Sequence, residues 1–219
     1  MKQTVFITGT DTHVGKTRVT CLILRALVAR GVKAVGFKPI LCGERTDAHA
    51  LLNASGNPAG LTLDDLNPVT LQPPAAPYTA SIIEERIIDL DAVRTAYGKL
   101  REKFEVVLVE GVGGWRVPIR RDYFVSDLAR EMNAPILLVT RPNLGTLNHT
   151  LLTVEAIERD RCPLMGIVMN QSVPEVDLIS DHTNGPMIEE LTGNPLLARV
   201  GFGETAPDLE KILKLLMDV

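Results

Sequence analysis

A short stretch near the N-terminus has the composition of a phosphate-binding loop. It reads Gly9-Thr10-Asp11-Thr12-His13-Val14-Gly15-Lys16-Thr17 and stands between an apolar run and a helical pattern. In such a turn, backbone N–H groups at a helix N-terminus point at the ligand, and their partial positive charge attracts phosphate oxygens. The Lys16 ammonium adds a full charge, and the Thr17 hydroxyl is the expected ligand of Mg²⁺. The sequence therefore predicts a nucleotide site here.

The match to the common phosphate-loop spacing is incomplete. That spacing, GxxxxGK followed by Ser or Thr, needs a glycine at position 10, where this chain has Thr10 directly after Gly9. The alternative is a simple turn between a strand and a helix. The position of the segment after a strand and at a helix start favours the nucleotide hypothesis.

Two carboxylates further along the chain are candidates for the other metal ligands. Mg²⁺ prefers hard oxygen donors, which we expect at the carboxyl ends of strands near the loop. Glu110 follows an apolar run at 106–109 and begins EGVGGW, whose glycines allow the backbone to approach a ligand closely. Asp47 comes just after a second predicted strand. The alternatives are a solvated glutamate in a glycine-rich turn and an aspartate that caps a helix.

A second lysine ends the predicted strand at 34–37. Lys38 stands before a proline that fixes the following turn, and a lysine at this position faces the same crevice as Lys16. Two ammonium groups can stabilise anionic oxygens during phosphoryl transfer, where catalysis is mostly positioning and charge stabilisation. The alternative is a solvated charge at a strand end.

Short apolar runs alternate with helical patterns along the chain. The predicted strands are 4–7, 34–37, 106–109, 136–139, 166–169 and 196–200, and the predicted helices are 17–30, 90–103, 126–132, 146–159 and 186–191. Because the strands are apolar on both faces, they indicate a mostly parallel sheet covered by helices on each side. We predict a single α/β domain over 1–219, a P-loop NTPase-like three-layer sandwich with a roughly seven-stranded sheet.

The proline-rich segment 57–77 is predicted to be mostly irregular. A loop of this length in a compact domain is often functional, and the alternative is a surface excursion. Both interpretations stay open on the sequence.

The bulk composition argues against several classes of partner. The chain has 219 residues, 45% apolar side chains and a formal net charge of −4, which suits one sizeable core but gives no positive field for DNA or RNA. Cys21, Cys42 and Cys162 are far apart, which argues against a zinc site or disulfides and fits a reducing cytoplasm. No apolar run approaches the ~20 residues of a membrane span. We expect a cytoplasmic protein without nucleic-acid or membrane partners.

Four segments, in their order along the chain, resemble the motif set of the dethiobiotin synthetases. They are GTDTHVGKT at 9–17, GFKP at 36–39, VEGVGGW at 109–115 and LGTLNH at 144–149, so the resemblance spans most of the chain. That family closes the ureido ring of dethiobiotin from 7,8-diaminopelargonate and CO₂ with ATP, giving ADP and phosphate. The resemblance implies a carbamate whose oxygen attacks the γ-phosphate, and a carbamic-phosphoric anhydride from which the second amine expels phosphate.

The resemblance also implies roles for individual residues. Lys38 and Lys16 neutralise carbamate and phosphate oxygens, and Thr12 helps to place the substrate. The implied ligands of Mg²⁺ are Thr17, Asp47 and Glu110. The implied nucleotide contacts are Gly9, His13, Val14, Gly15, Lys16, Thr17, Arg18, Asp47, Glu110, Gly111, Val112, Gly113, Asn170 and Gln171. The implied substrate contacts are Thr12, Lys38, Cys42, Gly145, Thr146, Leu147 and Asn148.

Two of these implied contacts concern the ends of the ligands. An asparagine such as Asn170 reads adenine in the family, and an amide has the two donors and the acceptor for this; the alternative is a turn residue. Residues 145–148 begin a predicted helix. In the family, the N-terminus of this helix binds the substrate carboxylate across a homodimer interface, so the resemblance implies a homodimer.

The chain departs from the family pattern at three places. Cys42 stands where relatives often have serine, which leaves its substrate contact open. His13 stands where an acidic residue is common and is alternatively a solvated loop residue. The segment 196–203 fits the usual adenine-loop pattern poorly, which bears on nucleotide selectivity.

Two other classes of protein share the predicted loop and sheet. Switch ATPases that partition DNA or position division machinery usually have an extra lysine early in the loop, where this chain has Asp11. Some of them end in an amphipathic helix that binds membranes. The apolar face of 209–217 allows this interpretation, and the alternative is a C-terminal helix that packs on the core. Amidotransferase relatives need an extra glutaminase region, for which 219 residues leave little chain. The synthetase hypothesis is therefore favoured.

Overall fold

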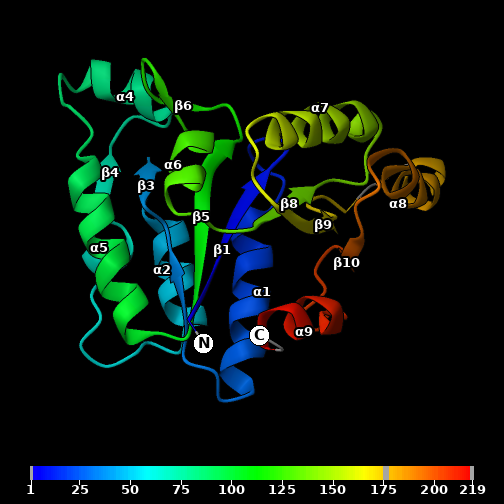
Figure 1. The fold of residues 1–219 in the computed structure, drawn as a ribbon, viewed down its shortest axis with the longest axis horizontal. Helices are drawn as coiled ribbons and strands as arrows, with labels where there is room; N and C mark the ends of the chain where they lie inside the picture. The colour runs from blue at the N-terminus through cyan, green and yellow to red at the C-terminus, as the bar shows by residue number, and fades with distance from the viewer. Residues whose placement is uncertain (1, 175–177, 218–219) are drawn as a thin grey trace.

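The centre of the computed structural model, which describes residues 2–174 and 178–217, is a parallel sheet of six strands in the order β10-β9-β8-β1-β5-β2 (Figure 1). Every pairing in this sheet is parallel. The strands are β1 (Gln3–Gly9), β2 (Ala34–Phe37), β5 (Val106–Gly114), β8 (Ile136–Thr140), β9 (Leu164–Asn170) and β10 (Leu196–Val200). Two small sheets lie beside it, a parallel pair of β3 (Ile40–Cys42) with β4 (Val69–Leu71) and an antiparallel pair of β6 (Pro118–Arg120) with β7 (Tyr123–Phe124).

The strands are apolar on both sides because both faces of the sheet are covered. Side chains alternate between faces along a strand. In β1, Phe6 therefore packs into one buried cluster, whereas Val5 and Ile7 pack into the other. All three side chains are at most 2% exposed. A continuous apolar run is thus the expected pattern of a strand between two helical layers.

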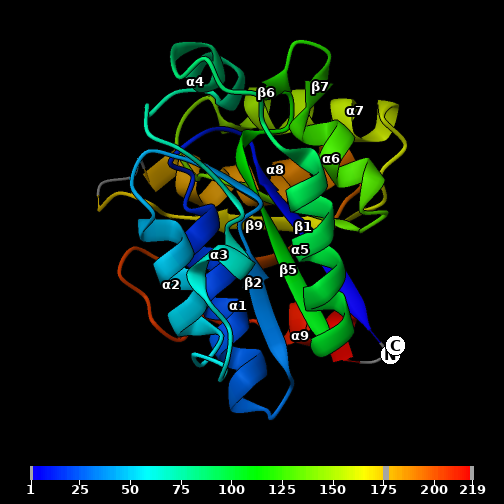
Figure 2. The ribbon, with the colours of Figure 1, turned by 90° about the vertical axis from the view of Figure 1, so that its left-hand side faces the viewer.

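The two helical layers lie on opposite faces of the sheet (Figure 2). One layer contains α1 (Lys16–Ala29), α2 (Thr46–Ala54) and α9 (Glu210–Met217). The other contains α5 (Leu90–Lys103), α6 (Val125–Glu131), α7 (Thr146–Arg159) and α8 (Leu178–Thr192). The short helices α3 (Leu63–Leu66) and α4 (Pro77–Ile83) complete the described elements. The architecture is the predicted three-layer α/β sandwich.

The predicted elements are present, with three differences of substance. β5 continues to Gly114, so Glu110 lies within this strand and not after its end, and the glycines that follow it are strand residues. The main sheet has six strands where roughly seven were predicted, and each of the six predicted strand segments is one of them. The helix predicted at 186–191 is the longer α8, which contains Pro186 in its interior. The sequence-based boundary was wrong because proline is usually found in a first turn. Residues 1, 175–177 and 218–219 of the predicted domain lie outside the described part.

The segment predicted to be irregular is partly ordered. It contains α3 and β4, and α4 begins at its end. Thr62 and Asp65 form a capping box that starts α3. The prolines therefore separate short elements, of which β4 pairs with β3 and α4 packs against both strands.

The C-terminal helix α9 packs its apolar face on the core. Ile212, Leu213 and Leu216 are each at most 4% exposed and belong to the cluster that α1 also lines. None of the helices within 2–174 and 178–217 combines the length and the apolar character that crossing a membrane requires.

Candidate active site

The predicted phosphate loop connects β1 to α1, and its two outer glycines are required by close packing. Gly15 has φ +90°, and a Cβ there would lie 2.1 Å from Nδ2 of Asn170. A Cβ on Gly9 would lie 2.6 Å from Cγ2 of Val14. Only glycine avoids the side-chain clash at these two points, and at Gly15 it also avoids left-handed strain. The loop is also tied to β8, because the Thr10 N–H donates to the Val139 carbonyl at 3.0 Å.

The Lys16 side chain lies back across the loop. Its ammonium donates to the Asp11 carbonyl oxygen at 3.0 Å. Burial, with a contribution from the nearby Lys38 charge, lowers the pKa of Lys16 to about 8. An anionic ligand between the two ammonium groups would reverse this effect, since an opposite charge favours the charged form.

Lys38 lies between the two predicted metal-binding carboxylates. Its Nζ is 2.5 Å from Oε1 of Glu110 and 3.0 Å from Oδ2 of Asp47. The side chains of Lys38 and Glu110 are 5% and 0% exposed, so this ion pair is buried. Burial alone would lower the pKa of Lys38, but the charges of Glu110 and Asp47 outweigh it and raise the pKa. Lys38 is therefore not the solvated strand-end charge that the sequence left open.

The remaining predicted metal ligands converge on the same point. The Thr17 hydroxyl donates to Oε1 of Glu110 at 2.7 Å. Asp47 lies in the first turn of α2, whose N-cap is Arg45, so Asp47 is not the N-cap. Burial alone would raise the pKa of Asp47, but the charge and hydrogen bond of Lys38 lower it. Four elements, α1, β2, α2 and β5, thus bring these side chains together.

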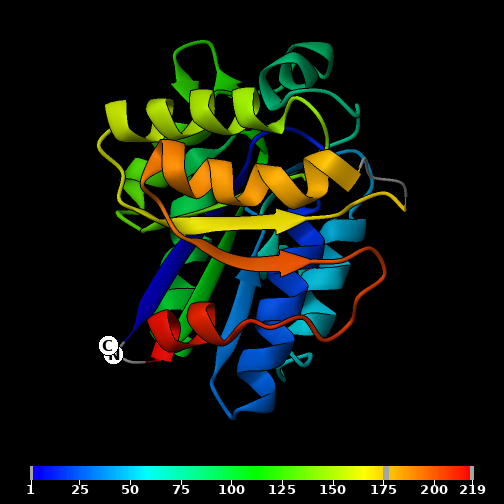
Figure 3. The same ribbon diagram turned by 90° about the vertical axis from the view of Figure 1, so that its right-hand side faces the viewer.

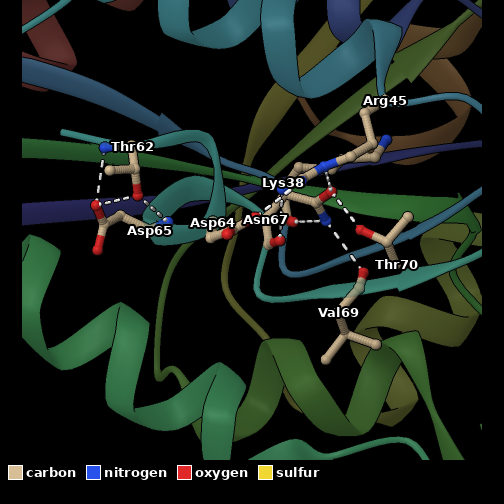
Figure 4. A network of polar contacts seen from close by, with 8 residues as sticks. All are labelled: Lys38, Arg45, Thr62, Asp64, Asp65, Asn67, Val69 and Thr70. Carbon is tan, nitrogen blue, oxygen red and sulfur yellow. Dashed lines mark hydrogen bonds and ion pairs between the residues drawn. The ribbon is translucent and has the colours of Figure 1, made fainter.

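The backbone of Lys38 is positioned by the segment that the sequence left undecided (Figure 4). The buried Asn67 amide donates to the Lys38 carbonyl at 2.9 Å and to the Val69 carbonyl at 3.1 Å. Its oxygen accepts from Arg45 Nε and from the Thr70 hydroxyl, both at 3.0 Å. Asn67 and Arg45 are not among the site residues predicted from the sequence. The available signal was the Asn-Pro pair at 67–68, since a residue before proline is held extended.

The donor atoms in this cluster fit a magnesium ion. Glu110 Oε2 is buried and has no hydrogen-bond partner among the residues that the structure describes. With the Asp47 carboxylate and the Thr17 hydroxyl it forms a set of hard oxygen donors, as Mg²⁺ prefers. The described residues contain no group of three or more His, Cys, Asp and Glu that could hold a metal. Two carboxylates and a hydroxyl nevertheless suit Mg²⁺, which usually keeps waters and substrate phosphates as its other ligands.

A cavity of about 720 Å³ opens beside this cluster. Its lining includes the predicted residues Thr12, His13, Gly15, Lys16, Thr17, Lys38, Cys42, Asp47, Glu110, Val112 and Gly113. Cys42 is half-buried in this wall, and burial raises the pKa of its thiol to about 11, which keeps it neutral. The volume is ample for a small substrate next to a triphosphate.

Other predicted residues lie away from this cavity within one chain. Asn170 is fully buried, and its Nδ2 donates to the Val14 carbonyl at 2.8 Å while its Oδ1 accepts from Arg18 at 3.0 Å. Residues 145–148 begin α7 and do not line the cavity; Gly145 and Asn148 are exposed, whereas the Thr146 hydroxyl is buried against Thr140 at 2.7 Å. Their predicted contacts with adenine and substrate stay predictions.

Comparison with known proteins decides the family. A family model described as an AAA domain matches residues 3–206. An ATP-dependent dethiobiotin synthetase of Akkermansia muciniphila is 43% identical over 95% of this chain and 96% of its own. Another, of Endomicrobium trichonymphae, is 40% identical over 96% and 97% of the two chains. The chain belongs to the dethiobiotin synthetase family. Like the other members of this family, it is an enzyme of the ligase class.

Solved structures show the fold alone. A ParA family ATPase of Chlorobium tepidum covers 99% of this chain and 88% of its own with a TM-score of 0.58 and 13% identity. A septum site-determining MinD protein of Pyrococcus horikoshii, complexed with Mg-ADP, covers 100% and 96% with a TM-score of 0.56 and 14% identity. These values confirm the P-loop NTPase-like fold. The far higher identity to synthetases argues against the switch-ATPase alternative.

Proposed function

We propose that this chain is a dethiobiotin synthetase that uses ATP and Mg²⁺ to close a ureido ring on 7,8-diaminopelargonate with CO₂, releasing ADP and phosphate. The observation that carries the proposal is the convergence of Lys16, Lys38, Thr17, Asp47 and Glu110 at one cavity beside the phosphate loop. The names of the relatives at about 40% identity support the same activity.

The phosphate loop binds the triphosphate in the proposed reaction. Its backbone N–H groups and Lys16 hold the phosphates, and a bound Mg²⁺ would supply charge neutralisation for the reacting phosphate. Thr17, Asp47 and Glu110 are the residues proposed to hold the ion. Lys38 lines the same cavity as Lys16 and Thr17, so a γ-phosphate held by the loop would face it.

Lys38 is proposed to orient the reacting carbamate. An ammonium has three N–H donors, and two of those of Lys38 point at Glu110 and Asp47. The remaining contact, with the Gly111 carbonyl at 3.4 Å, is long, so this donor is the one free to bind a substrate oxygen. The carbamate oxygen attacks the γ-phosphorus and ADP leaves; the second amine then attacks the carbamoyl carbon and phosphate leaves. Two anions are brought together by two ammonium groups.

The far end of the substrate is proposed to reach a second protomer. Leu144 is 89% exposed, and Gly145 beside it is the N-cap of α7, with φ +92°. The N-terminus of this helix is therefore open to a carboxylate from another subunit, which its partial positive charge would stabilise. This supports the proposed homodimer. Sedimentation velocity would measure the oligomeric state.

The test is phosphate release from Mg·ATP in the presence of the diamine and bicarbonate. Each component is omitted in turn, and dethiobiotin is detected by mass spectrometry. We expect phosphate release to require both the diamine and bicarbonate and to match product one to one. Hydrolysis that is independent of the diamine and yields no product would contradict the proposal and favour a switch ATPase.

A further inference from the structure

Arg18 holds together three segments that lie far apart in the sequence. Its Nη1 donates to Asn170 Oδ1 at 3.0 Å and to the Gln171 carbonyl at 3.1 Å. Its Nη2 donates to the Gly201 and Glu204 carbonyls, both at 2.7 Å. A guanidinium has four Nη hydrogens, so each of them has an acceptor in the protein. The Nε–H and the two flat faces of the group remain for other contacts.

A second cavity lies against this guanidinium. It has a volume of about 290 Å³, and its lining includes Thr17, Arg18, Cys21, Leu22 and the loop 203–205. Figure 3 shows the loop after β10 passing beside α1 and α2. Thr17 lines both this cavity and the one with Lys38. The two cavities therefore meet at the first turn of α1.

The expected position of the nucleotide phosphates indicates which part of the nucleotide would enter the second cavity. The carboxylates and Lys38 mark the γ-phosphate end of a nucleotide, on the side of β5 and β2. A nucleotide whose phosphates follow the N-terminus of α1 must extend its nucleoside the other way, past Thr17 and along Arg18. The apolar floor at Cys21 and Leu22 suits a flat aromatic ring.

We propose that Arg18 is the platform on which the nucleotide base stacks, held in place by its four hydrogen bonds to the β9 and β10 ends. This inference rests on the proposed ATP-dependent function and specifies how the same site takes the base. Guanidinium groups stack well on aromatic faces. Because every base has such a face, stacking is tolerant of base identity. The platform contributes affinity for the base without selecting adenine over guanine.

The test compares ligands with and without a base. Binding of Mg·ADP, Mg·GDP and inorganic tripolyphosphate is measured by isothermal titration calorimetry for the wild type, Arg18→Ala and Arg18→Lys. We expect both variants to lose roughly tenfold in affinity for ADP and GDP alike, because neither replacement has a planar cation. Tripolyphosphate, which reaches only the phosphate loop, is expected to bind each variant like the wild type. Thermal unfolding checks that the variants are folded.

A further variant separates stacking from general charge. Arg30 is exposed at the C-cap of α1 and is not among the residues that line either cavity, so Arg30→Ala removes an equal charge from the same helix without touching the proposed base site. We expect this control to keep its ADP affinity within about twofold of the wild type.

The outcomes distinguish this inference from the proposed function. Unchanged ADP affinity in Arg18→Ala, an equal loss for tripolyphosphate, or a matching loss in Arg30→Ala would overturn the stacking platform and leave the synthetase proposal intact. A discrimination between ADP and GDP that disappears in Arg18→Ala would also overturn it, in favour of a selecting role. A wild type that binds neither ADP nor tripolyphosphate would overturn both proposals.

Discussion

Replacing Lys38 by glutamine should destabilise the protein as well as stop turnover. The change leaves the Glu110 carboxylate, which is 0% exposed, without its cation at 2.5 Å. Removing one partner of a buried ion pair costs about 3–5 kcal/mol. Glutamine can still donate a hydrogen bond, and the loss at Asp47 is small because its side chain is 41% exposed and screened by water. We therefore expect a loss of about 3 kcal/mol in the free energy of unfolding.

Urea denaturation followed by circular dichroism measures this loss, in buffer with EDTA. A difference of about 3 kcal/mol corresponds to a fall in Tm of about 6–12 °C for a chain of this size. The matched control is Lys33→Gln, on an exposed lysine just before β2, which should change stability by less than about 0.5 kcal/mol. The double variant Lys38→Gln with Glu110→Gln removes both charges and should recover most of the lost stability.

Two results would refute this reasoning. If Lys38→Gln unfolds at the same urea concentration as the wild type, the ion pair is not the buried contact that the distances indicate. If the variant retains turnover, Lys38 has no part in the reaction, whatever its effect on stability. We expect no detectable turnover and ADP affinity close to that of the wild type.

Three further changes test other parts of the site and its support. Gly15→Ala should weaken Mg·ADP binding by more than about tenfold in calorimetry, because the new methyl meets Asn170 in a left-handed backbone position; unchanged binding would show that the loop is not packed as described. Glu110→Gln should weaken ADP binding in Mg²⁺ but not in EDTA, and an equal loss in both buffers would remove Glu110 from the metal site. The hydrogen bonds from Thr62 hold the pKa of Asp65 below its usual range, so their stabilisation is present above the unfolded-state pKa of about 4 and is lost as the pH falls below it. Urea titrations from pH 6 to 2 should therefore show a shallower loss of stability for Asp65→Asn, and identical pH dependence in the two proteins would contradict this role.

Much of the site could be predicted because it follows from strand order and loop chemistry. Lys38 and Glu110 each come directly after a run that is apolar on both faces, and such runs are typical of parallel strands in one sheet. β5 lies between β1 and β2, so both side chains reach the phosphate loop. Ion pairs between lysines and carboxylates are likewise expected, because two lysines and two acidic residues are predicted at one edge of the sheet. Local pattern was enough for these residues.

The supporting contacts could not be predicted because they join segments distant in sequence. Asn67 reaches Lys38 from 29 residues away, and Arg18 reaches Glu204 from 186 residues away. No periodicity or propensity encodes such pairs, since the packing of whole elements brings them together. The helical position of Asp47 depends on where α2 begins, and boundaries of this kind vary by a residue or two.

Two ammonium groups, Lys16 and Lys38, and two carboxylates, Asp47 and Glu110, face one cavity, and their formal charges cancel. A polyanion or a divalent cation arriving alone gains little long-range attraction from this set. A nucleotide and a metal ion that arrive as one complex can place opposite charges against opposite partners at the same time. The charge balance of the cavity thus favours the joint entry of metal and nucleotide over their stepwise capture, and it keeps unrelated phosphates from accumulating in front of the reacting lysine.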